Sequence, residues 1–246
     1  MKKLIIVIAA ATLASTPAYA QWSYGVLGIG FSMPYKGENS DPIIVPAAMY
    51  EGERIIWRGP SLQYKLTGFE QDEPSLRVSL ELAPNELEVE SSELSGIEDR
   101  DFSLLAGFRY IYPTQFGRFS AVFQTDATNK HNGQRGAINF QRVLFQDDNR
   151  QWVITAGAQV EYLSGNYADY YFGVSATEAA ASNFTEYQVD DIWQGGLTLG
   201  GYYQFNKNWR AIIQTRYLKL ADEVTDSPII DDNHTINGIV GITYQF

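Results

Sequence analysis

The feature that most restricts the fold of this sequence is a two-residue alternation of side-chain character along unusually long segments. From Ile236 to Phe246 every second residue is apolar, aromatic or glycine, whereas the positions between them include Asn237, Thr243 and Gln245. Successive side chains of a β-strand point to opposite faces, so a repeat of two predicts a strand with two different environments. The alternation recurs in segments of about 10 to 13 residues, whereas strands of soluble sheets have about 5 to 6 and strands that cross a bilayer need about 9 to 11.

Two folds produce such alternation: a secreted sandwich with its apolar faces packed inward, and a membrane barrel with its apolar faces turned to lipid. Aromatic residues gather near the ends of the apolar faces, as at Trp22, Trp152 and Trp209, where the interfaces of a membrane would lie. The chain also stops on Phe246, and Tyr244 and Phe246 together predict a C-terminal assembly signal. We therefore predict an all-β fold, a transmembrane antiparallel up-and-down β-barrel in the bacterial outer membrane, in contact with its lipid and lipopolysaccharide.

The first 20 residues predict an export signal that is cleaved and forms no part of the fold. Lys2 and Lys3 precede an apolar run from Leu4 to Ala14, and Ala18-Tyr19-Ala20 has the small-x-small pattern of a cleavage site. The run is too short to span a bilayer as a helix, which takes about 20 residues. Residues 21–246 are expected to form one barrel domain.

We expect ten strands, joined alternately by short turns and long polar loops. The approximate strand ranges are 22–31, 54–66, 75–82, 101–112, 117–126, 135–146, 150–162, 192–205, 208–220 and 236–246. Outer-membrane barrels have short periplasmic turns and long outer loops, so the long connections 83–101, 127–134, 163–191 and 221–234 are expected outside. If Ile43–Tyr50 and Tyr167–Val174 were also strands, the count would be twelve and the middle loops would change sides.

Composition excludes several classes of function. The net charge is −11, and nucleic-acid phosphates are bound by Lys and Arg, so we expect no nucleic-acid partner. The chain has no Cys and its two histidines, His131 and His234, are far apart in sequence, so we expect no disulfide, no zinc site and no cofactor. Acidic residues crowd the segments 86–101 and 222–232. They predict solvated loops, with weak Ca²⁺ or Mg²⁺ bridging as the alternative.

The candidates for nucleophilic catalysis are Ser175 and His234, since some outer-membrane barrels hydrolyse lipids. A serine hydrolase needs Ser, His and an orienting group within hydrogen-bond reach, and Asp231 and Asp232 precede His234 closely. However, the sequence around Ser175, Gly-Val-Ser-Ala-Thr, lacks the second glycine of a nucleophile elbow. We expect no enzymatic activity.

Polar and charged residues recur on the face opposite the apolar one, and we expect them to line the lumen. They are Arg77, Glu81, Arg109, Gln159, Glu161, Arg210, Gln214 and Arg216. In a narrow barrel these side chains would fill the interior as a network in which Arg pairs with Glu, because an unpaired buried charge is costly. A twelve-stranded barrel would leave room for a thin water channel, which stays an alternative.

A set of short motifs, in order along the chain, resembles one family of outer-membrane proteins. The set comprises His131-Asn132-Gly133, the block Asn166–Val174 with Tyr167, Tyr171, Phe172, Gly173 and Val174, then Ala179–Ser182, Tyr187, Ser227-Pro228 and the terminal Tyr244-Gln245-Phe246. Over essentially the whole mature chain these features are similar to the MipA/OmpV family.

The resemblance implies an outer-membrane protein without catalytic residues. It implies either a scaffold that joins a murein-degrading lytic transglycosylase to a murein-synthesising penicillin-binding protein, or a role in osmotic response, adhesion or permeability. On this ground we favour a scaffold of the murein machinery over a small channel, and both over a lipid hydrolase. The sequence does not predict an oligomeric state.

Overall fold

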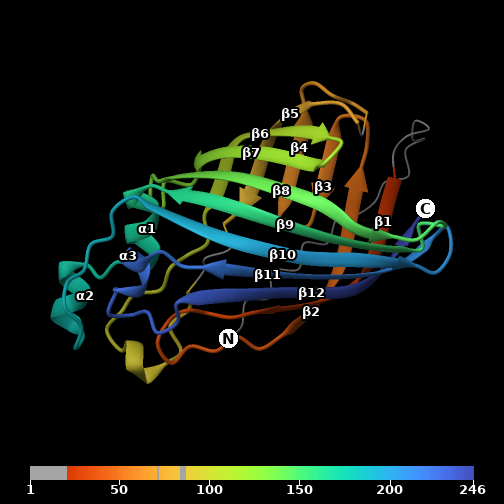
Figure 1. Cartoon of the computed structure of the whole chain (residues 1–246). Helices are drawn as coiled ribbons and strands as arrows, with labels where there is room; N and C mark the ends of the chain where they lie inside the picture. Colours follow the sequence, from red (N-terminus) through yellow and green to blue (C-terminus); the bar gives the residue numbers. More distant parts are fainter. Residues whose placement is uncertain (1–20, 71, 84–86) are drawn as a thin grey trace.

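The computed structural model describes residues 21–70, 72–83 and 87–246 of the chain. These residues form a closed barrel of twelve antiparallel strands, in which each strand pairs with its neighbours in sequence (Figure 1). The strands are β1 (Gln21–Phe31), β2 (Ile43–Glu51), β3 (Ile55–Arg58), β4 (Ser61–Lys65), β5 (Ser75–Leu82), β6 (Leu104–Thr114), β7 (Gly117–Asp126), β8 (Gln134–Gln146), β9 (Trp152–Leu163), β10 (Ile192–Gln204), β11 (Trp209–Lys219) and β12 (His234–Gln245). The barrel closes between β1 and β12, from Ser23 opposite Gln245 to Phe31 opposite Asn237.

Apolar side chains cover the outside of the barrel. Ile213 of β11 is 63% exposed and lies directly opposite Val240 of β12, which is 58% exposed. The next residue along β11, Gln214, instead lines a cavity inside the barrel. A water-soluble sandwich would bury these apolar residues, whereas a membrane barrel turns them to lipid. The predicted membrane barrel is therefore confirmed, with the apolar face outward.

The strand count is twelve, the higher of the two counts considered, but the added strands are only partly the expected ones. The segment Ile43–Glu51 is a strand, as the alternative proposed. The segment 54–66, expected as one strand, is two, because the chain reverses at Gly59-Pro60, where Gly59 has φ +55°. Such a positive φ suits glycine, which has no Cβ to clash.

The alternative strand Tyr167–Val174 is wrong, because most of this segment lies in helix α1 (Gly165–Phe172). Its buried side chains, Tyr167, Ala168, Tyr171 and Phe172, recur after three or four residues and form one helical face rather than alternating. Splitting 54–66 and adding β2 brings two further strands before the middle loops. These loops therefore stay on the side expected from the ten-stranded pattern.

The two ends of the barrel differ strongly. The long connections, with α1, α2 (Ala176–Ala181), α3 (Asp222–Thr225) and the 3₁₀ turn Ser92–Leu94, gather at one end, on the left in Figure 1. The C-terminus and the short turns lie at the other end. By the rule that long loops are external, the helical end faces outward and the other end faces the periplasm. The predicted export signal, residues 1–20, lies outside the described residues.

The long connections pack together into a second apolar core, which we call the cap. The cap comprises the described residues of 32–42, 83–103, 127–133, 164–191 and 220–233. Its most buried side chains include Tyr35, Leu87, Leu94, Tyr167, Tyr171, Val174, Val189, Val224 and Ile229. No helix among the described residues has the length and hydropathy of a transmembrane helix.

Candidate functional site

A ladder of alternating charges crosses the lumen. Arg109 Nη2 lies 2.7 Å from Glu81 Oε1, and Arg135 Nε lies 2.6 Å from Glu161 Oε1. Longer contacts join these pairs to each other and to the far wall, at 3.9 Å from Arg135 to Glu81 and 3.7 Å from Arg216 to Glu161. The ladder therefore runs from β6 through β5, β8 and β9 to β11.

Arg135, at the centre of this ladder, was not among the residues predicted to line the lumen. The alternation along β8 could have indicated its position. Arg135, Asn139 and Gln141 share one parity of this strand, whereas the apolar Ile138 and Phe140 share the other. Polar neighbours hold the ladder in place. Gln194 Nε2 donates to Glu161 at 2.9 Å.

The other predicted lumen residues lie outside the ladder. Arg77 donates to Gln63 and to Ser75, both at 3.1 Å. Arg210 donates to Gln204 at 2.7 Å and lies 4.2 Å above the ring of Tyr202. The last two, Gln159 and Gln214, line a cavity on the periplasmic side of the ladder.

Two cavities meet at the ladder. The lower cavity is about 320 Å³ and mostly polar, and the upper cavity, beneath the cap, is about 390 Å³. Arg135 and Arg216 line both, so these two side chains lie between the cavities. The ladder has three arginines and two glutamates, so it carries a net positive charge within a chain whose net charge is −11.

One wall of the upper cavity is apolar, contrary to the expectation of a polar interior. Ile29 and Phe31 of β1 and Ile239 of β12 line it, and Ile29 lies directly opposite Ile239. Ile239 belongs to the face of β12 that otherwise carries Asn237 and Thr243. The lumen is therefore amphipathic, with charges on β5–β11 and apolar side chains on β1 and β12.

Except for the terminal Tyr244-Gln245-Phe246, which lies at the opposite end of the barrel, the family-like motifs meet in the cap although they are scattered along the sequence. Tyr35 Oη donates to Tyr171 O at 3.1 Å, and Ser227 Oγ donates to Phe172 O at 2.6 Å. Val174 forms a β-bridge with Tyr187. Gly133 packs against α1 so closely that a Cβ there would lie 2.5 Å from the amide nitrogen of Tyr167. The motifs thus have a common structural role, which is to hold α1 across the outer mouth of the barrel.

A buried ion pair between Arg100 and Glu178 also holds the cap together, and the sequence analysis missed it. The two groups are 2.7 Å apart, and their side chains are 7% and 4% exposed. Arg100 also donates to Gly173 O at 3.3 Å, which links the connection 83–103 to the end of α1. Burial acts to raise the pKa of Glu178, but hydrogen bonds from the amides of Ser175 and Glu98 and from Arg100 outweigh it and lower the pKa.

A Ser–His–Asp arrangement occurs in the cap at Ser103, His131 and Asp126. Ser103 Oγ lies 3.0 Å from His131 Nε2, and His131 Nδ1 lies 4.0 Å from Asp126. Gly133 N–H donates to Nδ1 at 2.9 Å, so the neutral ring carries its proton on Nε2. A general base for serine needs the opposite tautomer. Ser103 is also 0% exposed, so this geometry is structural and not that of a hydrolase.

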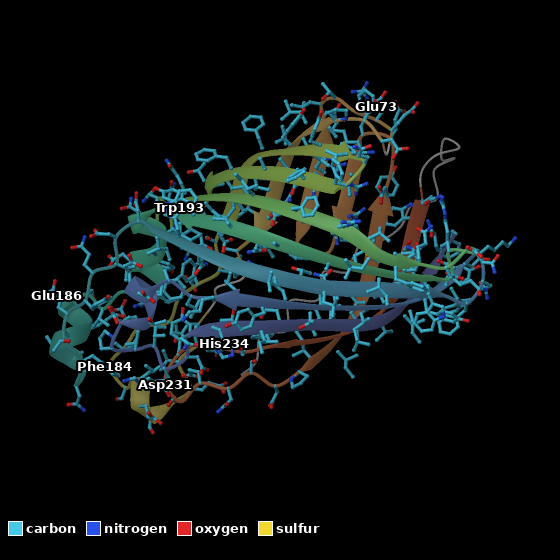
Figure 2. The ribbon with its side chains drawn as sticks, in the orientation of Figure 1. Glu73, Phe184, Glu186, Trp193, Asp231 and His234 are labelled. Atoms are coloured by element: carbon cyan, nitrogen blue, oxygen red, sulfur yellow. The ribbon has the colours of Figure 1, made fainter. Side chains whose placement is uncertain are left out.

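The predicted catalytic candidates have local structural partners. Ser175 caps α2, donating to Glu178 Oε2 at 2.8 Å and accepting from its amide in a capping box. His234 begins β12, where its ring stacks on Tyr217 at 5.2 Å and contacts Asn233. Figure 2 shows His234 and Asp231 at the cap end of the barrel. In the described part of the chain no group of three His, Asp or Glu side chains is placed to hold a metal ion.

Comparison with known proteins identifies the family. Residues 26–246 match the family described as MltA-interacting protein MipA. The chain belongs to this family. It is 31% identical to the MltA-interacting protein of Escherichia coli K12, with 100% of this chain and 99% of the relative aligned. It is 23% identical to the outer membrane protein OmpV of Vibrio cholerae, again over 100% of this chain and 99% of the relative. The predicted family and the outer-membrane location are confirmed.

Proposed function

We propose that this MipA-family barrel is an interaction protein, whose periplasmic end holds a murein-degrading lytic transglycosylase beside a murein-synthesising penicillin-binding protein. The occluded interior carries the proposal: a charge ladder crosses the lumen and a packed cap covers its outer mouth. A barrel closed in this way presents its rims, rather than a pore, to its surroundings. The name of the relative, MltA-interacting protein, supports the same role.

The connection between β4 and β5 is the best candidate contact on the periplasmic end. The described residues of 66–74 carry the exposed acids Glu70, Asp72 and Glu73, and Figure 2 shows Glu73 far from Asp231 of the cap and from His234 at the start of β12. Arg54 lies 4.8 Å from the ring of Phe69 and braces the base of this connection. Acidic side chains on a braced hairpin suit a basic surface on the partner.

The test measures binding of a purified lytic transglycosylase to the barrel in lipid nanodiscs. A triple variant, Glu70→Lys, Asp72→Lys and Glu73→Lys, should weaken association by about tenfold at low salt. The reversed charges would repel the basic surface of the partner instead of attracting it. The matched control reverses Asp222, Glu223 and Asp231 at the cap end and should leave association unchanged. Equal binding by both variants and the unmodified protein would remove this contact from the proposal.

A small channel is the second candidate, because the side chains of Arg135 and Arg216 line both the upper and the lower cavity and so lie between them. Side chains can move where backbone cannot, so displacement of these two groups would join the cavities. Stable conductance by the purified protein would favour the channel over the scaffold. The proposal assigns no catalysis to the barrel.

A further inference from the structure

The barrel wall has a gap beside β2. On one edge β2 pairs with β1 along its whole length, from Glu51 opposite Gln21 to Ile43 opposite Ile29. On its other edge it pairs with β3 only at Met49–Glu51. Among the described residues, therefore, no strand pairs with the β3-side edge of 43–48. At about 3.3 Å per residue this edge is about 20 Å long.

The gap arises because β3 and β4 are short. They have 4 and 5 residues, whereas β2 has 9 and β1 has 11. Their turn at Gly59-Pro60 therefore ends below the upper half of β2. Ile44, beside the gap, is 80% exposed, and Val26, which lies opposite Pro46, is 54% exposed. The gap thus opens within the apolar band of the wall.

Pro46 makes this edge of β2 unsuited to pairing with another strand. Gly52 N–H donates to Ile55 O at 2.8 Å, so the even-numbered residues of β2 turn their backbone groups toward β3. Pro46 has this parity and no N–H, which removes one donor from the middle of the free edge. Unpaired backbone at membrane depth is tolerated where it is buried in protein or lines a water-filled cavity.

The upper cavity reaches the lower border of the gap. Pro60, which forms the lower border of the gap, also lines the cavity together with Ile29 and Phe31 of β1. From this apolar wall the cavity extends to Arg216 of β11 and Arg135 of β8. The cavity is therefore apolar near the lipid and cationic in its depth.

The polar floor of this cavity has hydrogen-bonding groups without partners. Arg216 Nε and Gln194 Oε1 are buried and have no hydrogen-bond partner among the described residues, and Gln194 is 7% exposed. The charged residues that line this cavity are Arg135, Arg216 and Glu161, so its lining keeps one positive charge in excess. One anionic headgroup would compensate that charge and accept from Arg216.

We propose that the upper cavity binds a single-chain fatty acid, with its carboxylate at Arg216 and Arg135 and its alkyl chain along the β1 wall toward the gap beside β2. About 390 Å³ lies near the lower limit of ligand pockets, about 300 to 1,000 Å³, and suits one alkyl chain rather than the two of a phospholipid. This site is separate from the periplasmic contact and does not depend on the scaffold role.

The test uses the full barrel in lipid nanodiscs and dodecanoate carrying a diazirine in mid-chain, with cross-linked peptides identified by mass spectrometry. We expect saturable cross-links to 43–48 and Pro60, which unlabelled dodecanoate displaces and dodecanol, lacking the carboxylate, displaces at least about tenfold less well. Cross-links spread evenly over lipid-facing residues such as Leu197 and Ile213, or equal displacement by the acid and the alcohol, would overturn the proposal.

A variant locates the headgroup. Arg216→Gln should weaken dodecanoate binding by about tenfold, because a hydrogen bond to a charged group is lost. Arg210→Gln is the matched control, since Arg210 is a lumen arginine outside the cavity, and it should bind normally. Retained binding by folded Arg216→Gln would refute the headgroup site. The comparison of dodecanoate with dodecanol needs no variant and decides the matter if Arg216→Gln does not fold.

Discussion

The barrel wall and the cap bury their apolar side chains in opposite ways. In the wall, residues such as Ile213 and Val240 face lipid, and each strand is fixed by neighbours in sequence. In the cap, residues far apart in sequence form an inward core, as when Tyr35 reaches Tyr171 across 136 positions. The wall therefore buries its apolar side chains in lipid and the cap buries them in protein, with the charge ladder at the boundary between the two.

The largest expected effect is at that boundary. Glu161→Gln leaves Arg135 and Arg216 without their shared carboxylate and should destabilise the barrel by about 3 to 5 kcal/mol, the cost of breaking a buried ion pair. Glu51→Gln is the matched control, because its partner Arg58 is 55% exposed, and an exposed pair contributes at most about 1 kcal/mol. Urea unfolding of the protein in detergent measures both. Equal losses would mean that the ladder is no more buried than the rim.

A second prediction separates the two faces of the wall at adjacent positions. Ile213→Arg places a charge in lipid and should cost about 2 to 4 kcal/mol near the bilayer midplane. Gln214→Arg places the same side chain beside the lower cavity and should be much milder. Assembly is read from heat-modifiable gel mobility after insertion into vesicles. If both variants assembled equally well, the lipid-facing assignment would be wrong.

A third prediction tests whether the cap can be loosened without the wall. Ser227→Ala removes the 2.6 Å hydrogen bond to Phe172 O and should destabilise the cap by about 1 to 3 kcal/mol, because it leaves a buried acceptor unpaired. Thr225→Ala, which removes an exposed hydrogen bond in the same connection, is the control. Hydrogen exchange should increase in α1 and stay unchanged in β10–β12. Increased exchange throughout the barrel would show that wall and cap form one cooperative unit.

The smallest expected effect is a pH dependence confined to the cap. Burial lowers the pKa of His131 below its ordinary value of 6.5, against the opposing charge of Asp126. Protonation of His131 therefore favours the opened cap. The stabilisation of the cap by neutral His131 is complete above pH 6.5 and is lost as the pH falls through the lower pKa of His131 in the folded state. As the pH falls from about 7 to 5, the α1 amides should therefore lose protection against hydrogen exchange, measured relative to their intrinsic exchange rates. His131→Asn should flatten that change, and an unaltered profile would assign it to other groups.

The wall was largely predictable because its pattern is local. Alternation located most strands and their outward faces, and loop length assigned the two ends. The split of 54–66 was missed because the apolar residues on both sides of Gly59-Pro60 continue as if in one strand. The count of ten was wrong for this reason and because β2 was held as an alternative.

The cap was not predictable in the same way, since its contacts join segments that share no periodicity. The tyrosines of Asn166–Val174 drew attention as a family motif, but their role appears only when Ser103, His131 and Ser227 come to lie around them. The sequence predicted the type of contact in the ladder, which is Arg paired with Glu. Its central member Arg135 and the apolar wall at Ile29 escaped, because parity alone does not tell which lumen residues meet.

Planar-bilayer recording of the purified protein tests whether the ladder and the cap close this membrane barrel. A closed lumen should give a flat current trace, without stable single-channel steps, from protein whose heat-modifiable mobility shows that it is folded. Reproducible steps of one size from such protein would contradict the closed lumen and replace the scaffold with a channel.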